Sequence, residues 1–158
     1  MLRKAAFGAG CFWGVESLFR KVPGVTDAIV GYTGGELADP TYEDVCKSAT
    51  GHAEAVEVTY DTEQAGYDRL LEVFWNNHNP TTLNQQGPDR GTQYRSVIFY
   101  HDDEQRRLAE ASKQALVRSG KWQQPIVTEI TSAQTFYKAE EYHQRYFEKL
   151  GIEPTCHI

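Results

Sequence analysis

Strand-like and helix-like spacings of apolar residues alternate along this chain, and this alternation restricts the fold more than any other feature. Strand patterns occupy residues 3–8, 25–32, 53–60, 95–100 and 126–131, and helical patterns occupy residues 12–21, 40–46, 67–77, 102–118 and 138–149. Alternation of this kind predicts an α/β (α+β) fold, a two-layer sandwich in which helices flank a central mixed sheet of about four to six strands. A loop is expected over 79–93 and a long irregular tail over 150–158.

Length and charge restrict the class of protein. The 158 residues suit one domain, so we expect residues 1–158 to fold together, with the tail attached. The net charge of −6 disfavours a general role in binding nucleic acid or anionic membranes. No apolar run approaches the roughly 18 residues of a membrane span. The apolar N-terminal stretch is too short for a signal peptide, which predicts a cytoplasmic protein.

The chain has three cysteines, Cys11, Cys46 and Cys156, too few and too scattered for a disulfide framework. Cys11 lies between the turn Gly8-Ala9-Gly10 and a predicted helix, where free backbone N–H groups and the positive helix end would face its sulfur. Such surroundings lower the pKa of a thiol from roughly 8.5 and favour the reactive thiolate. A buried, unreactive cysteine followed by core aromatic residues fits these local features equally well.

Five ordered blocks of sequence carry a family resemblance. They are Gly-Cys-Phe-Trp-Gly-Val-Glu at 10–16, Thr-Tyr-Glu-Asp-Val-Cys at 41–46, Gly-His-Ala-Glu-Ala-Val at 51–56, Gly-Pro-Asp-Arg-Gly-Thr-Gln-Tyr-Arg-Ser at 87–96 and Ala-Glu-Glu-Tyr-His-Gln at 139–144. The chain resembles the A-type peptide methionine sulfoxide reductases over nearly its whole length. This resemblance implies reduction of methionine S-sulfoxide, free or in oxidised proteins, by a monomer that uses thioredoxin as its external reductant and no bound cofactor or metal.

The reaction needs a thiolate, a proton donor for the sulfoxide oxygen and a pocket for the methyl group. The resemblance implies that Cys11 is the nucleophile, that Glu54 is the acid, and that the hydroxyls of Tyr42 and Tyr94 hold the oxygen. A glutamate of ordinary pKa, near ~4.3, is ionised at neutral pH, so the acid would need an apolar site that raises its pKa. The residues alone also allow Glu54 to face solvent, as Glu57 is expected to do.

The same resemblance assigns Phe12 and Trp13 to the methyl pocket and Asp89 to the surroundings of the active centre. From its loop setting alone, Asp89 could equally be a turn former. Attack by Cys11 would leave a sulfenic acid, which condenses with a second thiol. The resemblance implies that Cys156 is this resolving thiol and that thioredoxin reduces the Cys11–Cys156 disulfide.

Other interpretations stay open from sequence alone. Cys46 is interpreted as structural, although a redox role is an alternative. A thiol peroxidase or cysteine hydrolase would use Cys11 with His52 as its base. A non-enzymatic aromatic cage would need an ionised Glu54 beside the aromatic residues. A metal site could be formed by Cys156, His157 and His143, but no paired ligand spacing supports it.

Overall fold

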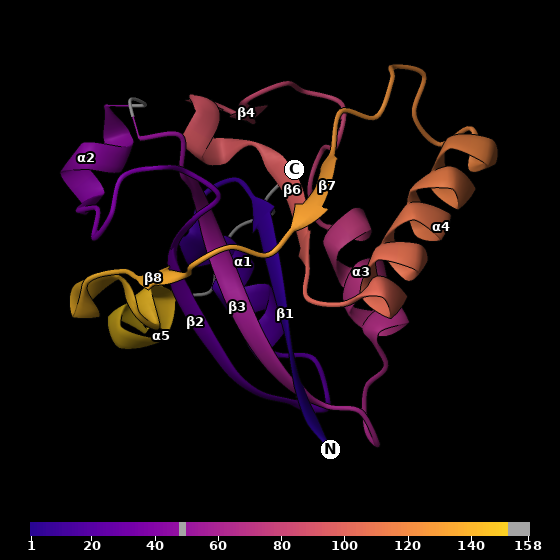
Figure 1. Cartoon of the computed structure of the whole chain (residues 1–158), viewed down its shortest axis with the longest axis horizontal. Coiled ribbons are helices and arrows are strands. Elements are labelled where there is room, and N and C mark those ends of the chain that lie inside the picture. The colour runs from indigo at the N-terminus through magenta and orange to yellow at the C-terminus, as the bar shows by residue number, and fades with distance from the viewer. Residues whose placement is uncertain (48–49, 152–158) are drawn as a thin grey trace.

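The computed structural model describes residues 1–47 and 50–151, and its centre is a six-stranded mixed sheet (Figure 1). The strand order is β7-β6-β1-β3-β2-β8, and every neighbouring pair is antiparallel except β6 and β7. The strands are β1 (Leu2–Ala9), β2 (Val25–Thr33), β3 (Ala53–Asp61), β6 (Ser96–Tyr100), β7 (Glu129–Ser132) and β8 (Tyr137–Lys138). The predicted class, helices around a central mixed sheet, is confirmed.

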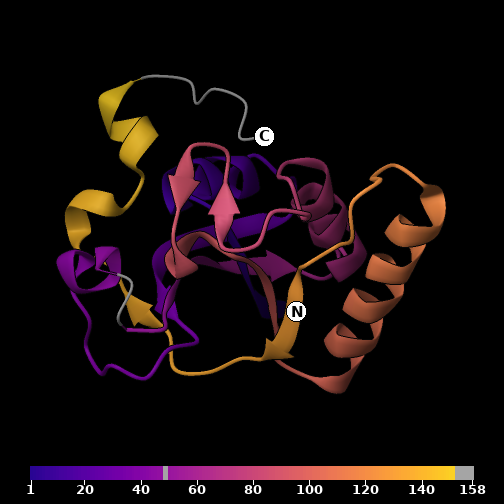
Figure 2. The ribbon, with the colours of Figure 1, turned by 90° about the horizontal axis from the view of Figure 1, so that it is seen from above.

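Helices α1 (Phe12–Arg20) and α3 (Tyr67–Asn76) pack on one face of the central strands. Phe7 of β1 anchors this layer, because its ring stacks on Phe19 of α1 at 5.0 Å and meets Phe74 of α3 at 5.3 Å. Aromatic contacts of this kind add to the hydrophobic stabilisation of a core. Helix α4 (Asp103–Ser119) packs beside α3 near β6 and β7, at the opposite edge of the sheet from β8 (Figure 2).

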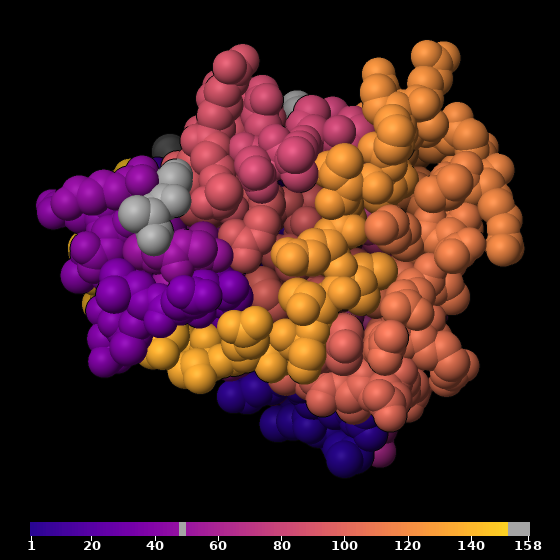
Figure 3. All heavy atoms as spheres, turned by 45° about the horizontal axis from the view of Figure 1, so that its top comes forward, coloured from indigo at the N-terminus to yellow at the C-terminus, as the bar shows by residue number. Residues whose placement is uncertain are grey.

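The second face of the sheet carries small and apolar side chains. Ala6, Ala55 and Phe99 form a separate buried cluster there, and Ala133 and Phe136 pack against it. The segment that joins β7 to β8 supplies these last two residues, and Figure 3 shows it crossing the surface from the side of α4 toward α2 (Tyr42–Cys46). The central strands β1 and β3 are therefore covered on both faces over this part of the sheet, where the polar side chain of Glu54 is buried.

The predicted helix over 138–149 is wrong. This region contains β8, the 3-10 turn η2 (Glu141–His143) and the short helix α5 (Tyr146–Leu150). The buried side chain of Gln144 accepts a hydrogen bond from Val30 N and donates to Val30 O, so it occupies the place of a further strand beside β2. Arg145 then has a left-handed backbone with φ 54°, which a continuous helix does not allow.

The remaining connections agree more closely with expectation. The stretch 79–93 is mostly irregular, as predicted, but holds the two-residue strands β4 (Gln85–Gln86) and β5 (Asp89–Arg90), and the 3-10 turn η1 (Thr92–Tyr94) follows. The strand expected over 126–131 is shorter and lies at Glu129–Ser132. Most of the predicted tail, 152–158, lies outside the described residues. Within the described part of the chain, no helix has the length and apolar character needed to cross a membrane.

Candidate active site

Cys11 is the N-cap residue of α1 and follows β1 directly through Gly10. Gly10 has φ 95°, a conformation that side chains rarely adopt, and it turns the chain from the centre of the sheet into the helix. The backbone N–H groups of Trp13 and Gly14 donate to the half-buried Cys11 sulfur. The predicted position at a helix start is therefore present, and the sulfur lies at the end of a central strand.

The predicted effect on the Cys11 thiol is wrong. Burial and then the negative charge of Glu54 raise the pKa of Cys11 to about 12, while the N–H groups of Trp13 and Gly14 lower it by less. The helix end stabilises the thiolate as expected, but loss of water around the sulfur is the larger effect. The contribution of Glu54 to the raised pKa of Cys11 disappears whenever the Glu54 carboxyl group is protonated.

Glu54 lies on β3, on the face covered by α1, and only 1% of its surface is exposed. Its Oε1 accepts a hydrogen bond from Phe12 N at 3.3 Å, whereas Oε2 is buried and has no hydrogen-bond partner among the described residues. Burial raises the pKa of Glu54 to about 8, against the opposing Phe12 N–H and with a smaller rise from the charge of Asp89. At neutral pH the group is therefore mostly a carboxylic acid, and its proton belongs on Oε2.

Tyr42, Tyr94 and Asp89 gather around this acid. Burial, followed by the charges of Glu54 and Asp89, raises the pKa of Tyr94. Burial also raises the pKa of Tyr42, with further contributions from its hydrogen bond to Cys46 and from the charges of Cys46 and Glu54. Both tyrosines are therefore neutral hydroxyl donors within electrostatic range of Glu54. Three of the five sequence blocks meet here, and a fourth supplies Cys11.

Phe12 and Trp13 point in different directions. Phe12 is buried against Tyr32, with ring centroids 5.7 Å apart. Trp13 is half-buried, stacks on Tyr146 at 3.7 Å, and donates from Nε1 to His143 Nδ1 at 3.0 Å. Phe12 therefore backs the site from the core, and Trp13 offers the more accessible aromatic surface.

Sequence reasoning missed His143 and Tyr146 as neighbours of the site. The His143 ring lies 4.5 Å from the Tyr42 ring and 5.2 Å from the Phe12 ring, so it packs between the two. Burial lowers the pKa of His143, which keeps the ring neutral and allows Nδ1 to accept from Trp13. The block at 139–144 was the available signal, but the expected helix obscured which of its side chains face inward.

The geometry also bears on the alternatives. His52 cannot serve as a base for Cys11, because its Nδ1 accepts from Gly35 N at 3.0 Å and its Nε2 contacts Leu37 O at 2.7 Å. An aromatic cage around a carboxylate conflicts with the raised pKa of Glu54. Among residues 1–47 and 50–151, no three His, Cys, Asp or Glu side chains gather as metal ligands, while Cys156 and His157 lie outside these ranges.

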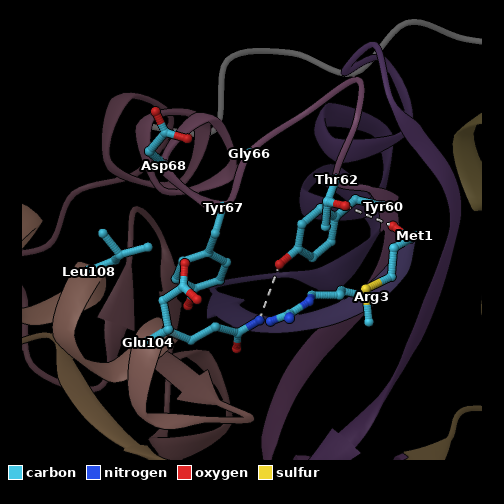
Figure 4. Close-up of a pocket in the computed structure, with 10 residues that line it drawn as sticks. Met1, Arg3, Tyr60, Thr62, Gly66, Tyr67, Asp68, Glu104 and Leu108 are labelled. Carbon is cyan, nitrogen blue, oxygen red and sulfur yellow. Dashed lines mark hydrogen bonds between the residues drawn. The ribbon is translucent and has the colours of Figure 1, made fainter.

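A separate cavity of about 330 Å³ lies at the other end of β1, next to the N-terminus (Figure 4). Tyr60, Tyr67 and Gln105 line it, and Gln105 donates to the Tyr60 hydroxyl at 3.3 Å. None of its described lining residues belongs to the predicted site. The cavity is therefore distinct from the site around Cys11.

Comparison with known proteins decides the family. A family model described as "Peptide methionine sulfoxide reductase" matches residues 3–158. The chain belongs to the peptide methionine sulfoxide reductase family. Its reductase relatives include the peptide methionine sulfoxide reductase MsrA of Methanothermobacter thermautotrophicus, 65% identical over 92% of this chain and 86% of that protein. The MsrA of Acidobacterium capsulatum is 55% identical over 99% of this chain and 100% of its own length.

Solved structures agree with this reductase assignment. Reduced Mxr1 from Saccharomyces cerevisiae has a TM-score of 0.88 and 36% identity, covering 98% of this chain and 89% of Mxr1. Methionine sulfoxide reductase A of Corynebacterium diphtheriae has a TM-score of 0.85 and 36% identity, covering 98% and 77%. Mxr1 in complex with Trx2 has a TM-score of 0.61 and 28% identity, covering 92% and 84%. The predicted family, fold and enzyme class are thus confirmed.

Proposed function

We propose that this protein reduces methionine S-sulfoxide, free or within oxidised proteins, to methionine, and so repairs oxidised proteins. The observation that carries the proposal is the junction of α1 and β3. A half-buried thiol at the helix start adjoins the buried acid Glu54, which the next residue, Phe12, holds through its backbone N–H. Reduction of a sulfoxide needs a nucleophilic sulfur beside a proton donor, and this junction provides both.

In the first step, the sulfoxide oxygen lies against Glu54 Oε2 and the hydroxyls of Tyr42 and Tyr94. These neutral donors stabilise the negative charge that develops on oxygen, as in an oxyanion hole. Phe12 and Trp13 hold the methyl group and exclude water. The Cys11 thiolate attacks the sulfoxide sulfur and forms an S–S bond, and Glu54 gives its proton to the oxygen. The S–S bond and the S–O bond of the substrate then break as the hydroxyl passes to the Cys11 sulfur. The oxygen ends on Cys11 as a sulfenic acid, so the thiol is oxidised while the sulfoxide is reduced to methionine.

Protonation of Glu54 favours the reaction at both the sulfoxide oxygen and the Cys11 sulfur. It supplies the proton for the oxygen, and it removes the negative charge that raises the pKa of Cys11. The N–H groups of Trp13 and Gly14 then stabilise the thiolate, and the smaller opposing charge of Asp89 is the one that remains nearby. The reactive form therefore combines a thiolate with a carboxylic acid, one proton fewer than the form in which both groups are protonated.

For recycling, we propose that the Cys156 thiol condenses with the sulfenic acid, which releases water and forms a Cys11–Cys156 disulfide. A dithiol of thioredoxin then reduces this disulfide by exchange. The relative Mxr1, solved in complex with Trx2, supports this class of partner. We further propose that residues 1–158 act as one domain with a C-terminal tail, as a monomer, in the reducing cytoplasm, where free thiols such as Cys11 and Cys46 persist.

Three cysteine variants test the proposal. Cys11→Ser should abolish reduction of the S epimer, measured as methionine released from a sulfoxide peptide. Cys156→Ser should release one methionine per protein and then stop with thioredoxin, and mass spectrometry should find the Cys11–Cys156 disulfide only when both cysteines are present. Cys46→Ser, the matched control, should support both steps. Turnover by Cys11→Ser, or activity only on the other epimer, would refute the proposal.

A further inference from the structure

Glu140 joins three segments that meet behind the candidate active site. Its Oε1 accepts a hydrogen bond from the Tyr32 hydroxyl at 2.9 Å, and its Oε2 accepts one from Tyr42 N at 3.0 Å. One carboxylate thus links the segment before η2 to β2 and to the first residue of α2. Burial acts to raise the pKa of Glu140, but the Tyr42 N–H, its own N–H and the Tyr32 hydroxyl hold it below its usual value.

Helix α2 needs this contact to hold Tyr42 in place. The helix has only five residues, and Val45 is its one fully buried side chain. Its Thr41–Asp44 capping box satisfies the N–H groups of those two residues, while the N–H of Tyr42 is satisfied by Glu140. An unsatisfied N–H in the first turn would otherwise weaken a helix that has little core to hold it.

The other partner of Glu140, Tyr32, lies beside the proposed acid, Glu54. Tyr32 is fully buried, packs on Phe12 and lies directly opposite Glu54 in the β2–β3 ladder. Glu140 therefore links Tyr32, the residue opposite Glu54, to the backbone of Tyr42. The separation between the acid and this hydroxyl depends on how far the Glu140 side chain reaches.

We infer that Glu140 is a positioning residue for the reductase reaction, one that sets the Tyr42 hydroxyl against the sulfoxide oxygen bound at Glu54. This inference rests on the proposed function. Glu140 touches neither substrate nor sulfur, and it acts through Tyr42. Misplacing a hydroxyl donor that stabilises developing charge costs up to about 100-fold in rate.

Variants that change either the length or the charge of the Glu140 side chain distinguish a positioning role from an electrostatic one. Glu140→Gln keeps the reach, because its amide oxygen can accept from Tyr42 N and its NH₂ can donate to the Tyr32 oxygen, and its rate of sulfenic acid formation should stay within about threefold of wild type. Glu140→Asp keeps the charge but not the reach, and should lose about tenfold or more. Glu141→Ala, a change at an exposed neighbouring glutamate, is the matched control and should leave this rate unchanged. Loss in the Gln variant with full rate in the Asp variant would overturn the inference.

A double-mutant cycle supplies the second readout. In a Tyr42→Phe background, Glu140→Asp and Glu140→Ala should change the rate by less than about twofold, because the hydroxyl that they misplace is gone. Equal losses with and without the hydroxyl would show a merely structural role and overturn the inference. Urea denaturation identifies any variant that fails to fold, and the Gln–Asp comparison then decides. Wild-type activity together with an inactive Cys11→Ser protein separates failure of this inference from failure of the proposed function.

Discussion

Replacing Glu54 with glutamine should stabilise the fold while it slows the reaction. The pKa of this carboxyl rises from 4.5 to about 8 on folding, because the side chain leaves water. Between these two values the folded protein binds a proton that the unfolded chain has lost, so the free energy of unfolding falls as pH rises. At neutral pH the difference is about 2.5 pH units at about 1.36 kcal/mol each, which makes the cost about 3 kcal/mol. Glutamine has no such proton to bind.

Urea denaturation at several pH values measures this cost. Near pH 4.5 the two proteins should differ little in their free energy of unfolding, apart from any change in packing. The advantage of Glu54→Gln should grow between about pH 4.5 and pH 8 and stay constant above. Glu57→Gln is the matched control, because Glu57 lies on the same strand and pairs with Lys4 at 3.2 Å toward the surface.

The activity of the same variant supplies the second half of the test. Glu54→Gln should form sulfenic acid at least about 100-fold more slowly, since the amide cannot transfer a proton to the sulfoxide oxygen. If Glu54→Gln and wild type show parallel pH dependences of unfolding, the burial argument for Glu54 fails. A stabilised variant with unchanged rate would instead refute its role as the acid.

Two further predictions concern the pH dependence of the reaction and the packing of Gln144. In single-turnover measurements, the wild-type rate of sulfenic acid formation should rise about tenfold per pH unit below pH 8 and level off above it, because the reactive form lacks one proton relative to the resting form; a rate that falls with pH in this range would contradict the scheme. Gln144→Ala should lower the free energy of unfolding by about 2 kcal/mol, since Val30 N loses its buried partner while Val30 O keeps only the Ala139 N–H, whereas the exposed Gln134→Ala should change it by less than about 0.5 kcal/mol in urea titrations.

Local sequence patterns correctly predicted the helices whose ends are determined by residues within a few positions. The glycine turn before Cys11 and the apolar spacing after it gave the start of α1, and Asp102 with Gly120 bounds α4 closely to the expected range. These features depend on backbone conformation and caps within a few residues. Residues 138–149 were mispredicted because a contact 114 residues away, from Gln144 to Val30, decides their conformation.

Some features of the candidate site were likewise predicted from the sequence and others were not. The family resemblance named Cys11, Glu54, Tyr42, Tyr94 and Asp89, and the structure brings all five together. Local reasoning could not give the raised pKa of Cys11, because burial by distant segments outweighs the adjacent helix end. The block at 139–144 pointed to His143 and Glu140, but their roles depend on contacts 130 and 98 residues away in the sequence, which local patterns do not predict.

The way in which the sheet holds the segment 137–150 has a kinetic consequence. Glu54 belongs to a long, central ladder and Cys11 follows directly on another, whereas this segment joins the sheet through the two-residue strand β8 and the side chain of Gln144. Local opening requires the loss of those contacts and of the side-chain contacts of Glu140, His143 and Tyr146, but of no long ladder, so its amide protons should exchange sooner than those of β1 and β3. The wall that carries His143 and Tyr146 can then detach while the nucleophile and its acid stay in register. In the sequence, Cys156 follows this wall by six residues after Leu150.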